Sequence, residues 1–251
     1  MSEALPEDPF YEGVVGPIPV AHGCNTIEDV QAASDQGFSY VEMDSLGTID
    51  GVAVAYHRPT LPWHRDGIDR LTFSEIKDMA ATKGRPDCSQ EEIMGAFPGM
   101  RFFINLKNVS AVRPVARIIS QLSAHNRVCI TSDFDYGRVR AVRELVNHNE
   151  PICSSMAAAG GLALAATRAK FPHAEDYIRN SGATQFTFPF QPVLPTTTER
   201  AHRLGMRVFV WTPNTEPQII AAIAKGVDGI MSDRTTLLRE LTDRTKHEAA
   251  L

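Results

Sequence analysis

Hydrophobic residues fall in short runs that alternate with amphipathic segments almost to the end of the chain. The short runs have the length of buried β-strands, whereas the amphipathic segments repeat their apolar residues at the spacing of an α-helix. The predicted core strands are residues 18–22, 40–44, 101–107, 127–133, 151–156, 184–190, 207–213 and 228–233. The predicted helices are residues 26–37, 71–84, 111–125, 137–147, 162–170, 199–205, 216–226 and 235–244.

This regular alternation of strand and helix is typical of a parallel sheet. Eight such repeats in about 250 residues indicate a closed (β/α)8 barrel. A further extended segment, residues 52–56, follows a turn at Asp50-Gly51, and we interpret it as a small insertion after the second strand. The sequence therefore predicts an α/β fold, a (β/α)8 TIM barrel, with residues 1–251 as one domain. Residues 1–16 form an N-terminal extension and residues 245–251 a C-terminal tail in this interpretation.

Polar residues gather at the C-terminal ends of the predicted strands, where barrels of this kind carry their active sites. Glu42 and Asp44 end the second strand, and a spacing of two places both carboxylates on the same face. Such carboxylates repel each other unless a positive group lies between them. Mg²⁺ or Ca²⁺ would fit an all-oxygen site, with the amide of Asn105 on the next strand as a further ligand. The alternative is a structural pairing of the carboxylates with Lys107 or an arginine.

Two histidines, a lysine and a tryptophan complete the candidate site. His22 and His57 each follow an apolar strand, and imidazoles titrate near neutral pH, so the pair could share acid and base roles. The alternative is one structural and one surface histidine. Lys107 lies on the same strand face as Asn105 and could contact a phosphate oxygen or a carboxylate. Trp211 could form a flat wall for an apolar or sugar-like group, or simply pack in the core.

Composition narrows the classes of partner. The net charge is −5, with 25 basic and 30 acidic residues spread along the chain, which argues against binding to nucleic acid or to an anionic membrane. The chain has no apolar run of the roughly 18 residues that a membrane span needs, and its start lacks signal-peptide features, so we expect a cytoplasmic protein. The four cysteines form no CxxC pair, and we expect reduced thiols without disulfides. The sequence carries no signature of an oligomer interface.

Several motifs occur together in the same order as the strands. They are the E-x-D of residues 42–44, TIDGVAVAYH (48–57), INLK (104–107), VFVWTPN (208–214) and GVDGIMSD (226–233). In combination they resemble the glycerophosphodiester phosphodiesterase family, which belongs to the barrel superfamily that also includes the phosphatidylinositol phospholipases C. The resemblance extends from about Pro17 to Arg234, which is nearly the whole chain.

The resemblance implies a role for each of these residues. Glu42 and Asp44 would be metal ligands, His22 and His57 the acid–base pair, and Lys107 a phosphate contact. It implies a metal-dependent phosphodiesterase of lipid metabolism. Its substrate would be a small molecule, a glycerophosphodiester or a lysophospholipid-type phosphodiester.

The sequence also departs from the family pattern. Gly23 follows His22 directly, so the usual arginine is missing, and Arg58 stands where an aspartate usually follows the second histidine. Asn105 replaces a glutamate ligand, and fewer anionic ligands predict weaker binding of a divalent ion. Arg58 could supply the missing arginine to an anionic substrate. A degenerate or repurposed barrel that binds a phosphorylated ligand, or runs another reaction, is therefore an alternative.

A second alternative comes from the first predicted strand. The run AHGCNTIEDV, residues 21–30, is similar to the start of the sphingomyelinase D/phospholipase D toxin branch. That resemblance implies transfer of phosphate to an internal hydroxyl and release of a cyclic product. The segment at residues 48–57 is more similar to the hydrolases, so both outcomes stay open at this point.

Overall fold

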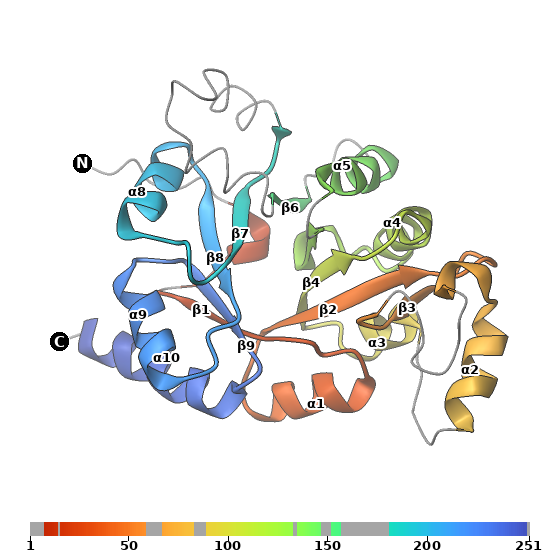
Figure 1. Cartoon of the computed structure of the whole chain (residues 1–251), viewed down its shortest axis with the longest axis horizontal. Helices are drawn as coiled ribbons and strands as arrows, with labels where there is room; N and C mark the ends of the chain where they lie inside the picture. The colour runs from red at the N-terminus through yellow and green to blue at the C-terminus, as the bar shows by residue number, and fades with distance from the viewer. Residues whose placement is uncertain are drawn as a thin grey trace. The chain divides into compact units, whose positions relative to one another are not determined.

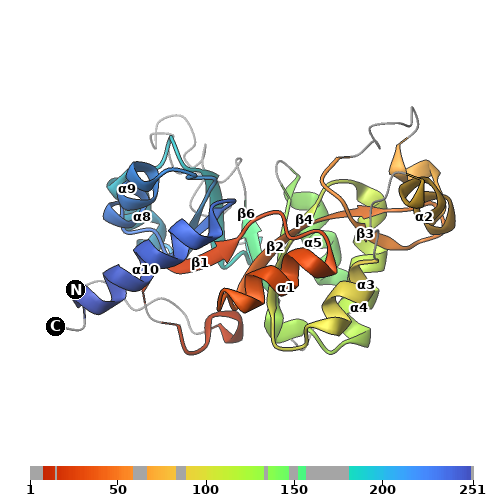
Figure 2. The ribbon, with the colours of Figure 1, turned by 90° about the horizontal axis from the view of Figure 1, so that it is seen from below.

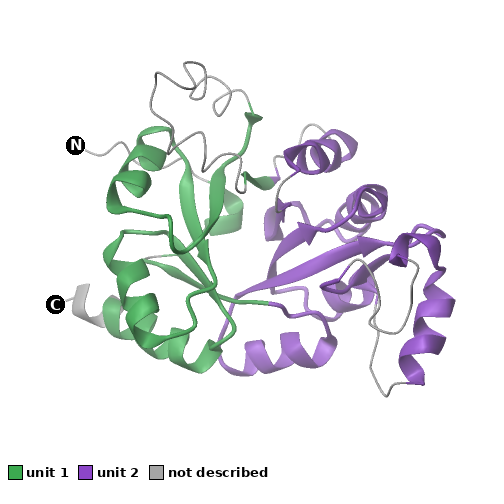
Figure 3. Ribbon diagram, viewed as in Figure 1, with its two compact units in different colours: residues 1–22, 153–251 green, residues 23–152 purple. Residues whose placement is uncertain are grey.

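The computed structural model describes residues 8–14, 16–58, 67–82, 89–132, 135–146, 152–156 and 181–249. The chain has the (β/α)8 barrel fold that the sequence predicted. Its residues form two compact units, coloured separately in Figure 3: unit 1 is Met1–His22 with Cys153–Leu251, and unit 2 is Gly23–Ile152. That residues 1–251 are a single domain stays a prediction.

Unit 1 contains five strands of the parallel sheet. They are β1 (Ile18–Ala21), β6 (Cys153–Met156), β7 (Gln185–Pro189), β8 (Arg207–Trp211) and β9 (Gly229–Ser232). Their order is β1-β9-β8-β7-β6, and each neighbouring pair is parallel (Figure 1). The described helices of this unit are η1 (Pro9–Tyr11), α8 (Pro195–Arg203), α9 (Glu216–Ala224) and α10 (Thr235–Ala249). Helix α8 packs on β8 (Figure 1), and α10 contacts both α9 and β1 (Figure 2).

Unit 2 contains the other strands, β2 (Tyr40–Gly47), β3 (Ala53–Ala55), β4 (Arg101–Leu106) and β5 (Val128–Thr131). Their order is β5-β4-β2-β3. Strands β2, β4 and β5 are parallel, whereas β3 pairs antiparallel with β2, as expected for an insertion after the second barrel strand. The helices are α1 (Ile27–Asp35), η2 (Ile68–Arg70), α2 (Phe73–Ala81), α3 (Gln90–Ala96), η3 (Val109–Ala111), α4 (Val112–Gln121), η4 (His125–Arg127) and α5 (Tyr136–Leu145).

The helix starts follow from local sequence. At α1, the Thr26 hydroxyl accepts from the backbone of Asp29 and the Asp29 carboxylate accepts from the backbone of Thr26, which satisfies N–H groups that the helix leaves unpaired. Many boundaries differ from the prediction by a few residues: β2 continues to Gly47, α8 begins earlier, at Pro195, and α10 continues to Ala249. Helix α3 was not predicted. The predicted helix at residues 162–170 lies outside the described residues.

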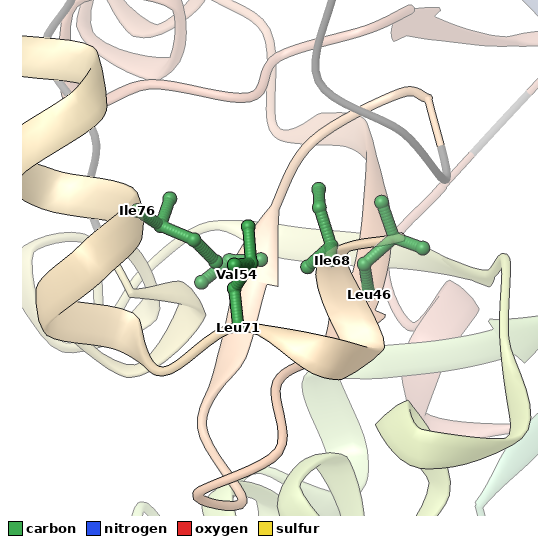
Figure 4. Close-up of a cluster of buried hydrophobic side chains, with 5 residues drawn as sticks. All are labelled: Leu46, Val54, Ile68, Leu71 and Ile76. Atoms are coloured by element: carbon green, nitrogen blue, oxygen red, sulfur yellow. The ribbon is translucent and has the colours of Figure 1, made fainter. Parts of the chain in front are cut away.

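A hydrophobic cluster anchors the insertion within unit 2 (Figure 4). Leu46 of β2 and Val54 of β3 pack with side chains from η2, its C-terminal cap and α2, namely Ile68, Leu71 and Ile76. Each of the five is at most 7% exposed. Fully burying an aliphatic side chain of this size stabilises a fold by about 1.5–3 kcal/mol. The cluster therefore holds the end of β3 in place, and His57 follows that strand closely in the chain.

The C-terminal end of β2 also makes an unusually close approach to the loop after β4. The Gly47 N–H donates to Asn108 Oδ1 at 2.9 Å, and Asn108 Nδ2 donates to the Gly47 carbonyl at 3.2 Å. A Cβ at Gly47 would lie 2.1 Å from the carbonyl carbon of Ser110. Only glycine fits this position, which fixes the ends of β2 and β4 against each other.

Candidate active site

Strand β2 places Glu42 and Asp44 on the same face, as their spacing predicted, and both are buried, at 3% and 2% exposure. Asp44 pairs in register with Asn105 on β4, whose side chain is 9% exposed. The three side chains predicted as metal ligands therefore lie on two adjacent strands of unit 2. The carboxylate of Glu42 also accepts a hydrogen bond from the Gly23 N–H at 3.0 Å. Gly23 has φ +70°, a conformation that glycine adopts without strain.

Asp44 is the centre of a hydrogen-bonded cluster. Its Oδ1 lies 3.0 Å from Lys107 Nζ, and its Oδ2 accepts from His57 Nδ1 at 3.0 Å and from Asn25 Nδ2 at 3.2 Å. Asn25 Oδ1 in turn accepts from the Asp44 backbone N–H at 2.9 Å. Asp44 is thus paired with Lys107, which was the alternative to a metal site. His57 and Lys107, both predicted site residues, lie together at Asp44.

The contact with Asp44 determines how His57 can act. An ionised carboxylate only accepts hydrogen bonds, so His57 carries its proton on Nδ1 and Nε2 becomes the nitrogen for proton exchange. The His57 side chain is 66% exposed, so a substrate can reach it. Arg58, the next residue, is exposed.

His22 and Trp211 belong to unit 1, whereas the other predicted site residues belong to unit 2. His22 Nδ1 lies 2.7 Å from Asp233 Oδ1, and the Asp233 Oδ2 accepts from Asn214 Nδ2 at 2.6 Å. Burial alone would raise the pKa of Asp233, but the hydrogen bonds from His22 and Asn214 and the charge of His22 hold it below its usual range. Trp211 ends β8 and is half-buried.

Sequence reasoning assigned no role to Asn25, Asn214 or Asp233. Asn214 and Asp233 lie at the C-terminal ends of predicted strands, where barrels of this kind carry their active sites. Their position in the sequence could therefore have indicated a role in the site. Asn25 precedes the N-cap of α1, and its contact with Asp44 joins residues 19 apart in the chain. Only the folded backbone brings these two side chains together.

The described cysteines Cys24, Cys129 and Cys153 are buried free thiols. Burial, followed by the negative charges of Asp29 and Glu42, raises the pKa of the Cys24 thiol well above its usual range. Cys24 is therefore neutral and a poor nucleophile. The fourth cysteine, Cys88, lies outside the described residues.

The chemistry of the donors fits a hard cation. Glu42, Asp44 and Asn105 offer only oxygen ligands, which Mg²⁺ and Ca²⁺ prefer. Among the residues that the structure describes, no three His, Cys, Asp or Glu side chains are grouped so as to hold a metal ion. A cation would therefore depend on two carboxylates and one neutral amide, and it would share Asp44 with the ammonium of Lys107.

Comparison with known proteins decides the family. The family model described as the glycerophosphoryl diester phosphodiesterase family matches residues 17–237. A relative from Mycobacterium tuberculosis, described as probable glycerophosphodiester phosphodiesterase 2, is 30% identical over 225 residues, which cover 86% of this chain and 84% of the relative. The chain belongs to the glycerophosphoryl diester phosphodiesterase family. The predicted class of enzyme, a phosphoric diester hydrolase, is confirmed with it.

Solved structures of this family share the fold. One is a glycerophosphoryl diester phosphodiesterase homologue from Silicibacter pomeroyi, with a TM-score of 0.78 and 18% identity, covering 96% of this chain and 99% of that one. Another is a phosphodiesterase from Oleispira antarctica in complex with the product sn-glycerol-3-phosphate, with a TM-score of 0.75 and 17% identity, covering 90% and 97%. Within the described part of this family member, no helix is long and apolar enough to cross a membrane.

Proposed function

We propose that this family member hydrolyses glycerophosphodiesters or lysophospholipid-type phosphodiesters, with His22 and His57 as its acid–base pair. The observation that carries the proposal is that each of these histidines bonds an aspartate through Nδ1, His22 to Asp233 and His57 to Asp44. In both rings Nε2 is then the nitrogen that can take or give a proton. The names of the relatives, and the product found in one of them, support this class of substrate.

Cleavage of a phosphodiester needs a base for the attacking oxygen and an acid for the leaving oxygen. One histidine takes the proton from a water molecule or a neighbouring hydroxyl of the substrate as that oxygen attacks phosphorus. The other histidine enters this step protonated on both ring nitrogens and gives its Nε2 proton to the alkoxide as the P–O bond breaks. We place His22 in the first role, as the base, and His57 in the second. If His22 acts instead as the nucleophile, its Nε2 bonds phosphorus as the leaving oxygen departs, and water then releases the phosphoryl group from the ring. Each proton transfer of this kind typically contributes 10²–10⁴-fold to the rate.

The second requirement is a positive group that neutralises the negative charge on the phosphoryl oxygens. Lys107 is held in place by Asp44 and its side chain is 13% exposed, so its ammonium can contact an anionic group through the remaining donors. Glu42, Asp44 and Asn105 would hold a divalent cation, Mg²⁺ or Ca²⁺. A bound cation would add positive charge beside the phosphoryl oxygens. Arg58, exposed next to His57, would contact the substrate from the insertion, and Trp211 would contact its apolar or glycerol part.

³¹P NMR of the purified protein tests the proposal directly. The protein is incubated with glycerophosphocholine and with lysophosphatidylcholine, each with Mg²⁺, with Ca²⁺ and with EDTA. A phosphomonoester signal supports hydrolysis, and its loss in EDTA supports the metal site. A cyclic phosphate signal would instead place the reaction with the transferase-like alternative, and no product in any sample would favour a degenerate, ligand-binding barrel.

Variants then test the two histidines. We expect His22→Ala and His57→Ala each to lower kcat at least about 100-fold. His202→Gln is the matched control, because His202 also bonds an aspartate, Asp228 at 2.8 Å, but has no role in the proposed site. Arg58→Ala should raise KM if that guanidinium contacts the substrate. Losses below tenfold in both histidine variants would contradict the acid–base proposal.

A further inference from the structure

A chain of hydrogen bonds in unit 1 extends from His22 to the start of α9. His22 Nδ1 bonds Asp233 Oδ1 at 2.7 Å, and Asp233 Oδ2 accepts from Asn214 Nδ2 at 2.6 Å. The Asn214 amide oxygen accepts from the Asp233 backbone N–H at 3.0 Å and from Ser232 Oγ at 2.8 Å. The Asn214 backbone N–H donates to Gln218 Oε1 at 2.9 Å.

We propose that Asp233 and Asn214 are positioning residues for His22, with Asp233 fixing the tautomer and orientation of the ring and Asn214 fixing Asp233. This inference rests on the proposed function of His22. It adds two residues that contact no reacting atom and act only through the histidine.

The orientation of the Asn214 amide follows from its surroundings. Its oxygen faces a backbone N–H and the hydroxyl of Ser232, whereas its NH₂ group faces the Asp233 carboxylate. In the reverse orientation the NH₂ group would face the backbone N–H, which is also a donor. The amide oxygen would then face the Asp233 carboxylate, which is also an acceptor. Gln218 caps α9 and also accepts a hydrogen bond from the Asn214 backbone N–H. The backbone and the side chain of Asn214 are therefore both held by hydrogen bonds.

Asp233 needs such support because its side chain is 53% exposed and water competes for its oxygens. A carboxylate left to rotate in water would exchange its contact with His22 for hydration. The hydrogen bond from Asn214 Nδ2 occupies Oδ2 and leaves Oδ1 directed at the imidazole. The lowered pKa of Asp233 agrees with a carboxylate that stays ionised while it holds the ring.

The consequence for proton transfer is specific. Because ionised Asp233 only accepts hydrogen bonds, His22 keeps a proton on Nδ1 and presents the lone pair of Nε2. When Nε2 takes the proton of the attacking oxygen, the ring becomes a cation, and the carboxylate of Asp233 stabilises it. The Nδ1 proton stays in place throughout, so Asp233 neither gains nor loses a proton.

Asp233→Asn tests the inference, because the new amide can donate to Nδ1 and so favours the wrong tautomer. We expect kcat to fall by roughly 10²–10⁴-fold while KM stays within a few fold. ¹⁵N NMR of the histidine rings should show His22 changing from the Nδ1–H to the Nε2–H tautomer. Asn214→Ala keeps the carboxylate and should lower kcat by only about tenfold.

The matched control is Asp228→Asn, which changes the same kind of contact in the same unit. Asp228 Oδ2 lies 2.8 Å from His202 Nε2 and also accepts from the Val208 N–H at 2.7 Å. We expect this variant to be less stable but to keep kcat within about twofold. A folded Asp233→Asn protein with unchanged kcat, or with the His22 tautomer unchanged, would overturn the inference. An inactive wild type would refute the proposed function instead. The ¹⁵N NMR experiment would still test whether Asp233 sets the tautomer of His22.

Discussion

Lys107 and Asp44 form a largely buried ion pair, with Nζ 3.0 Å from Oδ1 and with side chains 13% and 3% exposed. Removing the ammonium would leave the carboxylate buried with His57 and Asn25 as its remaining partners. We therefore expect Lys107→Met to lower the free energy of unfolding by about 3 kcal/mol. Urea denaturation followed by circular dichroism measures this loss.

Lys77→Met is the matched control for that variant. Lys77 lies on the exposed side of α2, where its ammonium stacks over the Phe73 ring at 5.3 Å. Surface substitutions of this kind change stability by about 0.5 kcal/mol or less. Equal losses in the two variants would mean that the Lys107–Asp44 pair is not a stabilising contact.

Substitution by alanine should change the stability of the protein in opposite directions at Gly47 and at Gly95. A Cβ at Gly47 would meet the backbone of Ser110 at 2.1 Å, so Gly47→Ala must displace η3 from the end of β2. We expect a loss of about 3 kcal/mol, at the upper end of the range for overpacking. Gly95 lies in α3 with no atom within 4 Å of the added methyl, and Gly95→Ala should stabilise the protein by about 0.4–1 kcal/mol. Thermal unfolding of both variants checks the signs.

The strand pattern of this barrel could be predicted because buried parallel strands are continuous apolar runs. Helix α3 was missed because its seven residues give too short an apolar pattern, although the capping pair Ser89 and Glu92 marks its start in the sequence. The spacing of Glu42 and Asp44 predicted their shared face. It could not predict that Asn25 completes the Asp44 cluster, because that contact depends on how the loop before α1 returns to β2.

The N-terminal segment is the clearest case of a contact that no local pattern contains. Sequence analysis treated residues 1–16 as an extension, yet the Phe10 and Tyr11 side chains are buried at 0% and 6% exposure. Tyr11 contacts Cys153 and Gln185, which are 142 and 174 residues further along the chain. Short local windows carry no information about such distant partners.

Tyr11→Phe tests the contribution of that segment to stability. The Tyr11 hydroxyl donates to Gln185 Oε1 and lies 3.1 Å from Cys153 Sγ, and both partners are buried. Removing it leaves a buried amide oxygen without this donor, which should cost about 2 kcal/mol in the free energy of unfolding. Tyr136→Phe is the control, since that half-buried hydroxyl accepts a long, 3.4 Å hydrogen bond from Arg143. We expect the control to change stability by less than about 1 kcal/mol, as measured by urea denaturation.

The contact between His202 and Asp228 should make stability depend on pH. The hydrogen bond to Asp228 raises the pKa of His202 above 6.5, although burial and Arg207 oppose the shift. Because the folded state holds this proton more tightly than the unfolded state, the contribution is complete below pH 6.5 and is lost as the pH rises through the folded pKa. His202→Gln should therefore destabilise the protein more at pH 5.5 than at pH 9. Urea denaturation of wild type and variant at the two pH values measures the difference, and an equal loss at both would contradict the linkage.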